Sequence, residues 1–127
     1  MLRLTTFALA YLATQAAGPI RVSCIGDSIT VGVCSSNGMN YPAILQTLLG
    51  PNYLVQNFGN SGKTMLKNGL CGPPPSGNCS YWATPQWPAA QASTPDIVTI
   101  MLGTNDAKIF NIGNIARSNY EQQRKLF

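Results

Sequence analysis

The sequence predicts an α/β domain built on a parallel β-sheet. Short β-rich runs alternate with helical segments in the order strand, helix, strand, loop with helix, strand, helix, and such alternation is typical of parallel strands joined by helical crossovers. The chain has 127 residues, enough for one domain, and 45% of them are hydrophobic, as in globular proteins. Each strand-like run ends in a distinctive polar turn (GDS, NFGNSG and GTND), and these carboxyl ends are where doubly wound sheets bind ligands.

The first strand is expected at residues 20–25 (IRVSCI), a β-rich run that stops at the GDS turn. A helix is expected at residues 41–49, because Pro42 lies near its start and Gly50 directly after its end. Proline early and glycine late are the usual marks of a helix start and stop.

The second strand is expected at residues 53–58. Residues 59–84 are rich in Gly, Pro, Ser and Asn and form a long irregular segment, which in a small domain is usually functional. Residues 85–93 are a helix candidate. Residues 96–102 (DIVTIML) are almost continuously apolar, which predicts a strand covered on both faces. Residues 115–127 are predicted to be helical.

The first 17 residues have the layout of a secretory signal peptide. Arg3 precedes the apolar run at residues 4–13, and small residues follow it before Gly18, so cleavage is expected after Ala16 or Ala17. The run is too short to span a bilayer, which disfavours the alternative of an uncleaved membrane anchor. The sequence therefore predicts a secreted protein whose domain comprises residues 18–127, without a stable membrane anchor.

The chain has four cysteines: Cys24, Cys34, Cys71 and Cys79. In a secreted protein they predict two disulfides, and three pairings are open. Cys71 with Cys79 is favoured, because the two bracket a loop of Gly, Pro, Ser and Asn that a short bridge would order. Cys24 lies within a predicted strand, where a buried free thiol is as reasonable as a bridge. Asn78 begins a glycosylation sequon.

The net charge is +4. The positive residues form no basic run or stripe, so the sequence gives no support to a nucleic-acid partner.

Residues 57–64 (NFGNSGKT) come close to a phosphate-binding P-loop, which requires Gly, four free positions and then Gly-Lys-Ser/Thr. Asn57 occupies the place of the first glycine. A phosphate site also needs a helix that begins at the lysine, whereas Lys63 is followed by further glycines and three prolines. A nucleotide-binding function is therefore a remote alternative.

A hydrolase site assembled from the three turns fits the residues better. Ser28 lies in a sharp turn after a strand, where a serine hydroxyl can be presented as a nucleophile. The N–H of Gly62 in the second turn and the side chain of Asn105 in the third turn are suitable donors for an oxyanion hole. Each signal is weak by itself, but together, each after its own strand, they predict an ester hydrolase.

The turns GDSIT, NFGNSG and GTND resemble the first three sequence blocks of the SGNH (GDSL) hydrolase family, and the resemblance covers roughly residues 21–111. It implies a flavodoxin-like three-layer α/β/α sandwich that hydrolyses lipid esters, acyl thioesters or acetylated sugars without a metal or organic cofactor. It assigns Ser28 as the nucleophile, which forms an acyl-enzyme. Gly62 and Asn105 are implied as oxyanion donors, with the Ser28 N–H as the third. Lys63 is then a solvated side chain.

Within that family, MLGTNDAK and NFGNSGKT are most similar to secreted esterases of the sialate O-acetylesterase-like branch. This similarity implies a small-molecule or glycan ester as substrate. The aromatic residues Tyr81, Trp82 and Trp87, in or next to the long irregular segment, are candidates to stack on a sugar ring. The alternative for all three is packing within the loop.

The resemblance breaks at the fourth family block, an Asp-x-x-His near the C-terminus, because the chain has no histidine. The catalytic triad cannot close within these residues. A lysine base (Lys63, Lys67 or Lys108) is not supported by spacing, and Asp27, Asp96 and Asp106 are better assigned to structural positions than to the triad acid.

Two explanations for the missing histidine remain open. The chain is either the N-terminal part of a longer hydrolase, truncated after the third strand and the following helix, or an inactive relative that binds glycan or acyl groups. The first is preferred, because a three-stranded remnant would expose its sheet edge.

Overall fold

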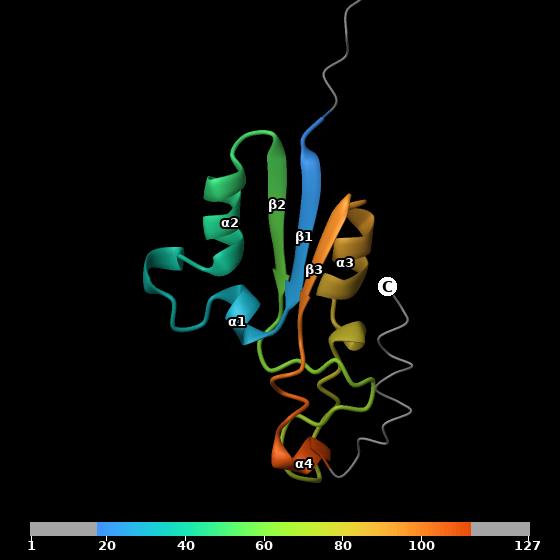
Figure 1. The fold of residues 1–127 in the computed structure, drawn as a ribbon. Coiled ribbons are helices and arrows are strands. Elements are labelled where there is room, and N and C mark those ends of the chain that lie inside the picture. The colour runs from blue at the N-terminus through green and yellow to red at the C-terminus, as the bar shows by residue number, and fades with distance from the viewer. Residues whose placement is uncertain (1–17, 113–127) are drawn as a thin grey trace, which may run out of the picture.

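A computed structural model describes residues 18–112 of the chain. Its centre is a parallel sheet of three strands in the order β2-β1-β3, formed by β1 (Ile20–Gly26), β2 (Tyr53–Gly59) and β3 (Ile97–Met101). Because all three strands run the same way, their carboxyl ends meet at one edge of the sheet, where the long loops gather (Figure 1). The predicted α/β architecture is confirmed.

Strand β1 lies between the other two and is the most buried part of the sheet. Its residues pair in register with β2, from Ile20 opposite Tyr53 to Gly26 opposite Gly59, and with β3, from Val22 opposite Ile97. The stretch from Val22 to Gly26 is buried throughout. A central strand has neighbours on both sides, so this short β-rich run forms the middle of the fold.

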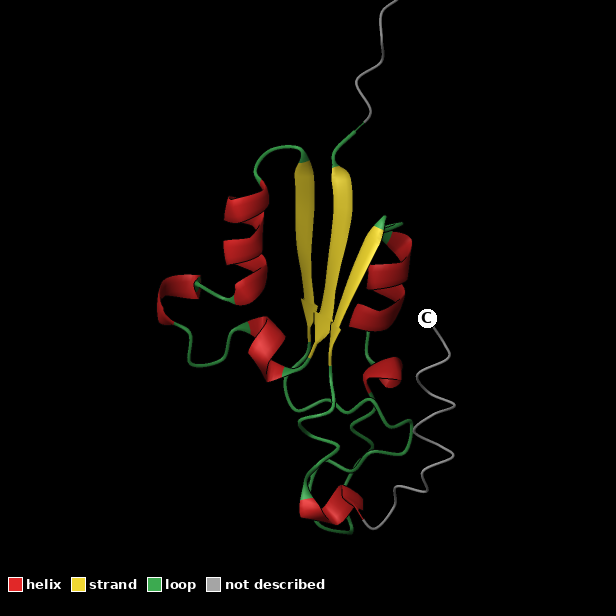
Figure 2. Ribbon diagram, viewed as in Figure 1, coloured by secondary structure: helices red, strands yellow, loops and turns green. Residues whose placement is uncertain are grey.

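Helices flank the sheet on two sides (Figure 2). The short α1 (Ser28–Val31) and α2 (Tyr41–Leu49) follow β1 and lie on one side, and α3 (Gln86–Ala92) lies on the other. Two 3-10 turns, Ser36–Gly38 and Tyr81–Ala83, and the short α4 (Ile109–Ile112) complete the described elements.

Helix α2 forms where the sequence predicts it. The Asn40 side chain accepts a hydrogen bond from Ala43 N at 3.0 Å and caps its start, with Pro42 in the first turn. Gln46 then ties the helix to the edge strand β2. Its Oε1 accepts from Val55 N at 2.7 Å, and its Nε2 donates to Tyr53 O at 3.0 Å. The side-chain amide thus satisfies backbone groups that an edge strand would otherwise leave unpaired.

The prediction that the third strand is covered on both faces is wrong for the part of the chain that the structure describes. Ile97, Val98, Ile100 and Met101 of β3 are 46, 41, 39 and 41% exposed. The strand lies at the sheet edge, with β1 as its one partner among the described residues. A continuous apolar run identifies a strand but does not say which elements lie beside the strand or cover its faces.

The other predicted elements agree with the structure to within a few residues. The helices α1 and α4 are not predicted because four residues give no periodic signal. The signal peptide predicted for residues 1–17 and the helix predicted for residues 115–127 lie outside the described residues. Within residues 18–112, no helix has the length and apolar character needed to cross a membrane.

A disulfide joins Cys71 and Cys79, as predicted, and closes the loop between them. Cys71 N also donates to Gly77 O at 3.1 Å, and Cys79 N to Gly69 O at 2.7 Å. Cys24 is a buried free thiol and Cys34 an exposed one, so the second predicted bridge is absent among the described residues.

Candidate active site

Ser28 is held where β1 turns into α1. Asp27 caps this helix, because its Oδ1 accepts a hydrogen bond from Ile29 N at 3.0 Å, and Ser28 is the first helical residue. The turn requires glycine at position 26, since a side chain there would overlap that of Thr30 and come within 2.8 Å of Met101 O. Ser28 itself is partly exposed. A strand, a tight turn and a helix start therefore present its hydroxyl at the carboxyl edge of the sheet.

The second turn lies beside the first. Asn60 N donates to Gly26 O at 2.9 Å, which fixes the end of β2 against the end of β1. Gly62 follows with a φ of +75°, a conformation that favours glycine. Apart from Gly62 and its two chain neighbours, no heavy atom of the described residues lies within 4 Å of the position that a Gly62 side chain would occupy. The turn is thus open at Gly62.

Asn105 connects all three turns. Its side chain is buried, and Nδ2 donates to Asp27 Oδ2 at 3.2 Å and to Lys63 O at 2.9 Å. Asp27 precedes Ser28, and Lys63 follows Gly62. The structure therefore brings Ser28, Gly62 and Asn105 to one edge of the sheet, held by a single amide. Because both N–H groups of that amide are engaged, donating to a substrate oxygen requires Asn105 to release or share one of these bonds.

A second set of buried polar contacts, not expected from the sequence, joins the loop at residues 63–70 to residues 105–111; we call it the inter-loop seam. Asp106 accepts from Met65 N at 2.9 Å and from Leu66 N at 2.7 Å. Asn111 bonds to both backbone groups of Leu70. Asp27 and Asp106 both form the structural hydrogen bonds expected of residues in turns, but their partners include residues far along the chain. Asn111 gives no signal in the sequence beyond a polar residue in a short apolar helix.

Similarity to known proteins agrees with this geometry. Residues 24–124 match the sequence pattern of the GDSL-like Lipase/Acylhydrolase family. The chain belongs to this family. An acetylxylan esterase of Xylanibacter ruminicola is 43% identical over 110 residues, which make up 84% of this chain and 21% of that protein.

The fold is also similar to solved structures. The crystal structure of AlinE4, an SGNH-hydrolase family esterase, and that of its D162A mutant each match with a TM-score of 0.52 and 23% identity. Each match covers 86% of this chain and 51% of the other. The chain thus spans about half of AlinE4 and about a fifth of the acetylxylan esterase.

In this GDSL-like chain, Tyr81 and Trp82 lie in the 3-10 turn Tyr81–Ala83, and Trp87 lies in helix α3. Tyr81 is completely buried, its hydroxyl donates to Phe58 O at 2.6 Å, and burial raises its pKa. Trp82 donates from Nε1 to Met65 O at 2.6 Å and packs edge-on against Trp87 with ring centroids 4.9 Å apart. In this structure Tyr81 is a core residue and offers no face to a sugar, so the packing alternative applies to it. Trp82 and Trp87 are partly exposed.

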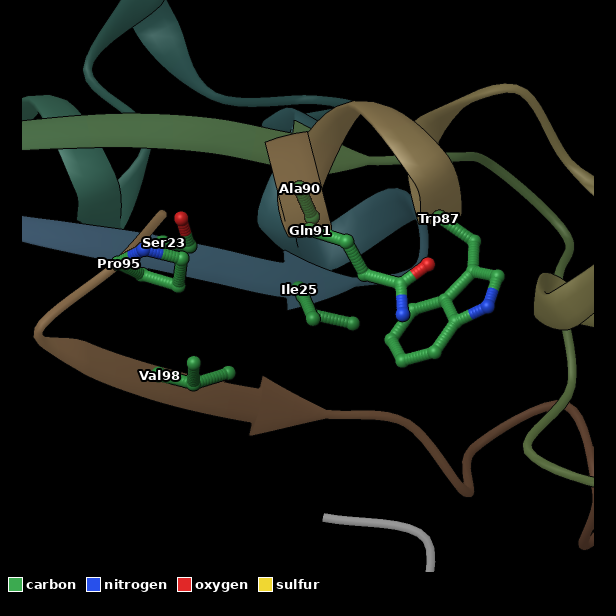
Figure 3. A pocket seen from close by; sticks show the side chains of 7 residues that line it. All are labelled: Ser23, Ile25, Trp87, Ala90, Gln91, Pro95 and Val98. Atoms are coloured by element: carbon green, nitrogen blue, oxygen red, sulfur yellow. The ribbon is translucent and has the colours of Figure 1, made fainter. Parts of the chain in front are cut away.

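Trp87 also lines an apolar cavity of about 270 Å³ between α3 and the strands β1 and β3 (Figure 3). Its lining comprises Ser23, Ile25, Trp87, Ala90, Gln91, Pro95 and Val98. None of these is Ser28, Gly62 or Asn105, so the cavity is distinct from the group of turns that the family motifs form.

The P-loop alternative lacks its structural requirement. No helix begins at Lys63 within residues 18–112, and the segment that follows it is irregular up to the turn at Tyr81–Ala83. In that described range, no cluster of three or more His, Cys, Asp or Glu side chains is placed to hold a metal ion.

Asp96 lies at the amino end of β3, and the hydrogen bonds it accepts from Arg21 lower its pKa.

Proposed function

We propose that the full polypeptide carrying this sequence is a serine ester hydrolase whose nucleophile is Ser28. The observation that carries the proposal is the Asn105 amide, which bonds to the residue before Ser28 and to the residue after Gly62. These two hydrogen bonds support the proposal, because acyl transfer requires a nucleophile and oxyanion donors close together. Membership of the GDSL-like family supports the same chemistry.

In the proposed reaction, Ser28 Oγ attacks the ester carbonyl carbon and its proton passes to a base. The negative charge that develops on the carbonyl oxygen is stabilised by Gly62 N–H, Asn105 Nδ2–H and the N–H of Ser28. The C–O bond to the alcohol breaks, the alcohol leaves with a proton, and an acyl-enzyme remains. Water then attacks the acyl-enzyme and releases the acid and free Ser28.

The base is proposed to come from outside these 127 residues, since they contain no histidine. A serine hydroxyl without a base is a poor nucleophile at neutral pH. The chain matches only part of the acetylxylan esterase and of AlinE4, which supports a longer catalytic domain.

The proposed substrates are O-acetyl esters of sugars, because the 43% identical relative is an acetylxylan esterase. Secretion is proposed with them, on the signal-peptide layout of residues 1–17. A glycan in the extracellular space is a substrate that a secreted esterase can reach.

The second candidate is a binding module that holds glycan or acyl groups without turnover. The absence of histidine is the observation in its favour. It predicts saturable binding of an acetylated oligosaccharide and no covalent chemistry at Ser28.

Labelling with a fluorophosphonate, followed by peptide mapping, separates these two functions. We expect the full polypeptide to be labelled at Ser28, S28A to lose both label and acetyl-ester hydrolysis, and S36A to retain both. Ser36 is the matched control because it is an exposed serine in the 3-10 turn Ser36–Gly38, outside the three motifs. Turnover by S28A equal to that of the unmodified protein would refute the assignment, and binding without labelling would support the second candidate.

A further inference from the structure

Asn111 occupies an unusual place for an amide. It lies in α4, and its side chain is 0% exposed. Nδ2 donates to Asn105 O at 2.9 Å and to Leu70 O at 3.3 Å, while Oδ1 accepts from Leu70 N at 2.8 Å. Both amide N–H groups are therefore used, and both bond to backbone carbonyls.

The residues that Asn111 joins belong to different loops. Leu70 is 41 positions away in sequence and Asn105 is 6 positions away. Leu70 is itself restrained, because it precedes Cys71 of the disulfide and forms an isolated antiparallel bridge with Asn78. Asn111 thus links the backbone of Asn105 to a loop that a covalent bond closes.

This link acts on the residue whose side chain connects the three turns. The Asn105 carbonyl accepts from Asn111, and the Asn105 amide donates to Asp27 and Lys63. A shift in the Asn105 backbone would move Nδ2 relative to Ser28. Displacing a catalytic group by about 1 Å can cost roughly 100-fold in rate, so a contact that fixes this backbone can affect a reaction without touching the substrate.

Packing alone does not account for an amide at this position. An apolar side chain would fill the same space without the cost of desolvating a polar group. The amide is satisfied only because it meets the backbone groups of Asn105 and Leu70, and its loss would leave those groups unpaired in a buried place.

We infer that Asn111 is a positioning residue for the oxyanion hole, acting through Asn105. This inference rests on the proposed function, because it assigns Asn111 a place in the reaction at Ser28. It adds a residue that lies outside the three family motifs GDSIT, NFGNSG and GTND and whose hydrogen bonds go to Asn105 and Leu70 rather than to Ser28.

The test compares N111D with N68D in the full polypeptide. N111D keeps the side-chain shape but replaces the two N–H donors by an oxygen that faces the carbonyls of Asn105 and Leu70. N68D makes the same chemical change at an exposed residue of the neighbouring loop. Turnover of an activated acetyl ester is measured per active site, with sites counted from the acyl-enzyme burst, so that loss of folded protein does not enter the rate.

We expect N111D to lower kcat per site about 10- to 100-fold with KM changed less than about twofold, and N68D to change neither. A double-mutant cycle with N105A then tests the route. If Asn111 acts through Asn105, adding N111D to N105A lowers kcat by less than about twofold, because the donor is already gone. A purely structural role predicts fewer titrated sites with unchanged kcat per site.

Unchanged kcat per site in N111D, or independent effects in the cycle, would overturn the inference. If N111D yields no folded protein, N111S takes its place, because it removes the amide without introducing a carboxylate. Its kcat per titrated site is compared with that of the unmodified protein in the same way. Failure of the proposed function has a different signature, since S28A would then retain turnover and Ser28 would take no fluorophosphonate. Loss of both in S28A with an unaffected N111D contradicts the positioning role alone.

Discussion

The two ends of the sheet use the same interaction in opposite surroundings. At the amino ends, Asp96 Oδ2 accepts from Arg21 N at 2.7 Å and from Arg21 Nε at 3.4 Å, and the side chains of Arg21 and Asp96 are 41 and 47% exposed. At the carboxyl ends, Asp106 accepts from two backbone N–H groups and is buried. An aspartate bound to backbone is thus common to both ends, whereas burial distinguishes the end where the site lies.

Burial of polar groups is concentrated at the carboxyl end. Its turns, loops and short helices contain the buried polar side chains of Asp27, Thr30, Thr64, Ser80, Asn105, Asp106 and Asn111. Each such group costs free energy unless it is hydrogen-bonded. Among the described residues, Thr30 Oγ1 and Ser80 Oγ have no hydrogen-bond partner, whereas the other five side chains are hydrogen-bonded. Buried hydrogen bonds of this kind rigidify the segments they join, which suits the proposed role of this end in holding oxyanion donors in place.

Replacing Asn105 should give the largest effect at the carboxyl end. We expect N105A to lower kcat of the full polypeptide about 100- to 1000-fold, the usual cost of one lost oxyanion donor. Steady-state kinetics on an activated acetyl ester would measure it, with N68A as an exposed control. A change in KM with kcat preserved would contradict the role of Asn105 as a donor to the transition state.

The matched substitutions D106N and D96N test the comparison between the ends directly. D106N leaves one of Met65 N and Leu66 N without an acceptor, next to a new amide N–H in a buried place. We expect a loss of about 3 kcal/mol in the free energy of unfolding, measured by urea denaturation. D96N makes the same change in solvent and should have a much smaller effect. Equal losses of stability in D106N and D96N would show that burial does not determine how much each aspartate contributes.

The disulfide closes the loop next to the inter-loop seam, and removing it should cost slightly less stability than D106N. A disulfide stabilises the folded state mainly by restricting the unfolded chain. Cys71 and Cys79 are 8 positions apart, and closing such a loop is worth about 2.5 kcal/mol on an entropic estimate. We expect the double variant C71S/C79S to lose about that much stability in urea denaturation. C34S, which removes an exposed free thiol, should leave stability unchanged. A loss in C34S as large as in the double variant would argue against a contribution from the bridge.

The sequence predicts what local patterns encode. The order of strands and helices, the start of α2 and the Cys71–Cys79 bridge follow from short-range signals, and all are confirmed. The motif residues Ser28, Gly62 and Asn105 are assigned by resemblance, and they do lie at one edge of the sheet. Their roles in a reaction remain predictions.

The parts that could not be predicted depend on contacts between distant residues. Asp106 meets Leu66 across 40 positions and Asn111 meets Leu70 across 41; an isolated Asn or Asp in a turn has the same local sequence whether it bonds to its neighbours or to another loop. The exposure of β3 is mispredicted for a related reason. Hydropathy reports how apolar a strand is, while its burial depends on which elements lie beside it.

The amino end gives the smallest expected effect and a pH dependence that sharpens the contrast. Hydrogen bonds from Arg21 hold the pKa of Asp96 below its ordinary value of 3.8. A carboxyl with a lowered pKa stabilises the folded state above its unfolded pKa, and this contribution is lost as pH falls through the folded pKa. The stability difference between the unmodified protein and D96N should therefore be small and constant from neutral pH to about pH 4, and disappear below that. Urea denaturation at a series of pH values and low salt would measure it, and a difference that grows on acidification has the wrong sign for an aspartate stabilised by Arg21.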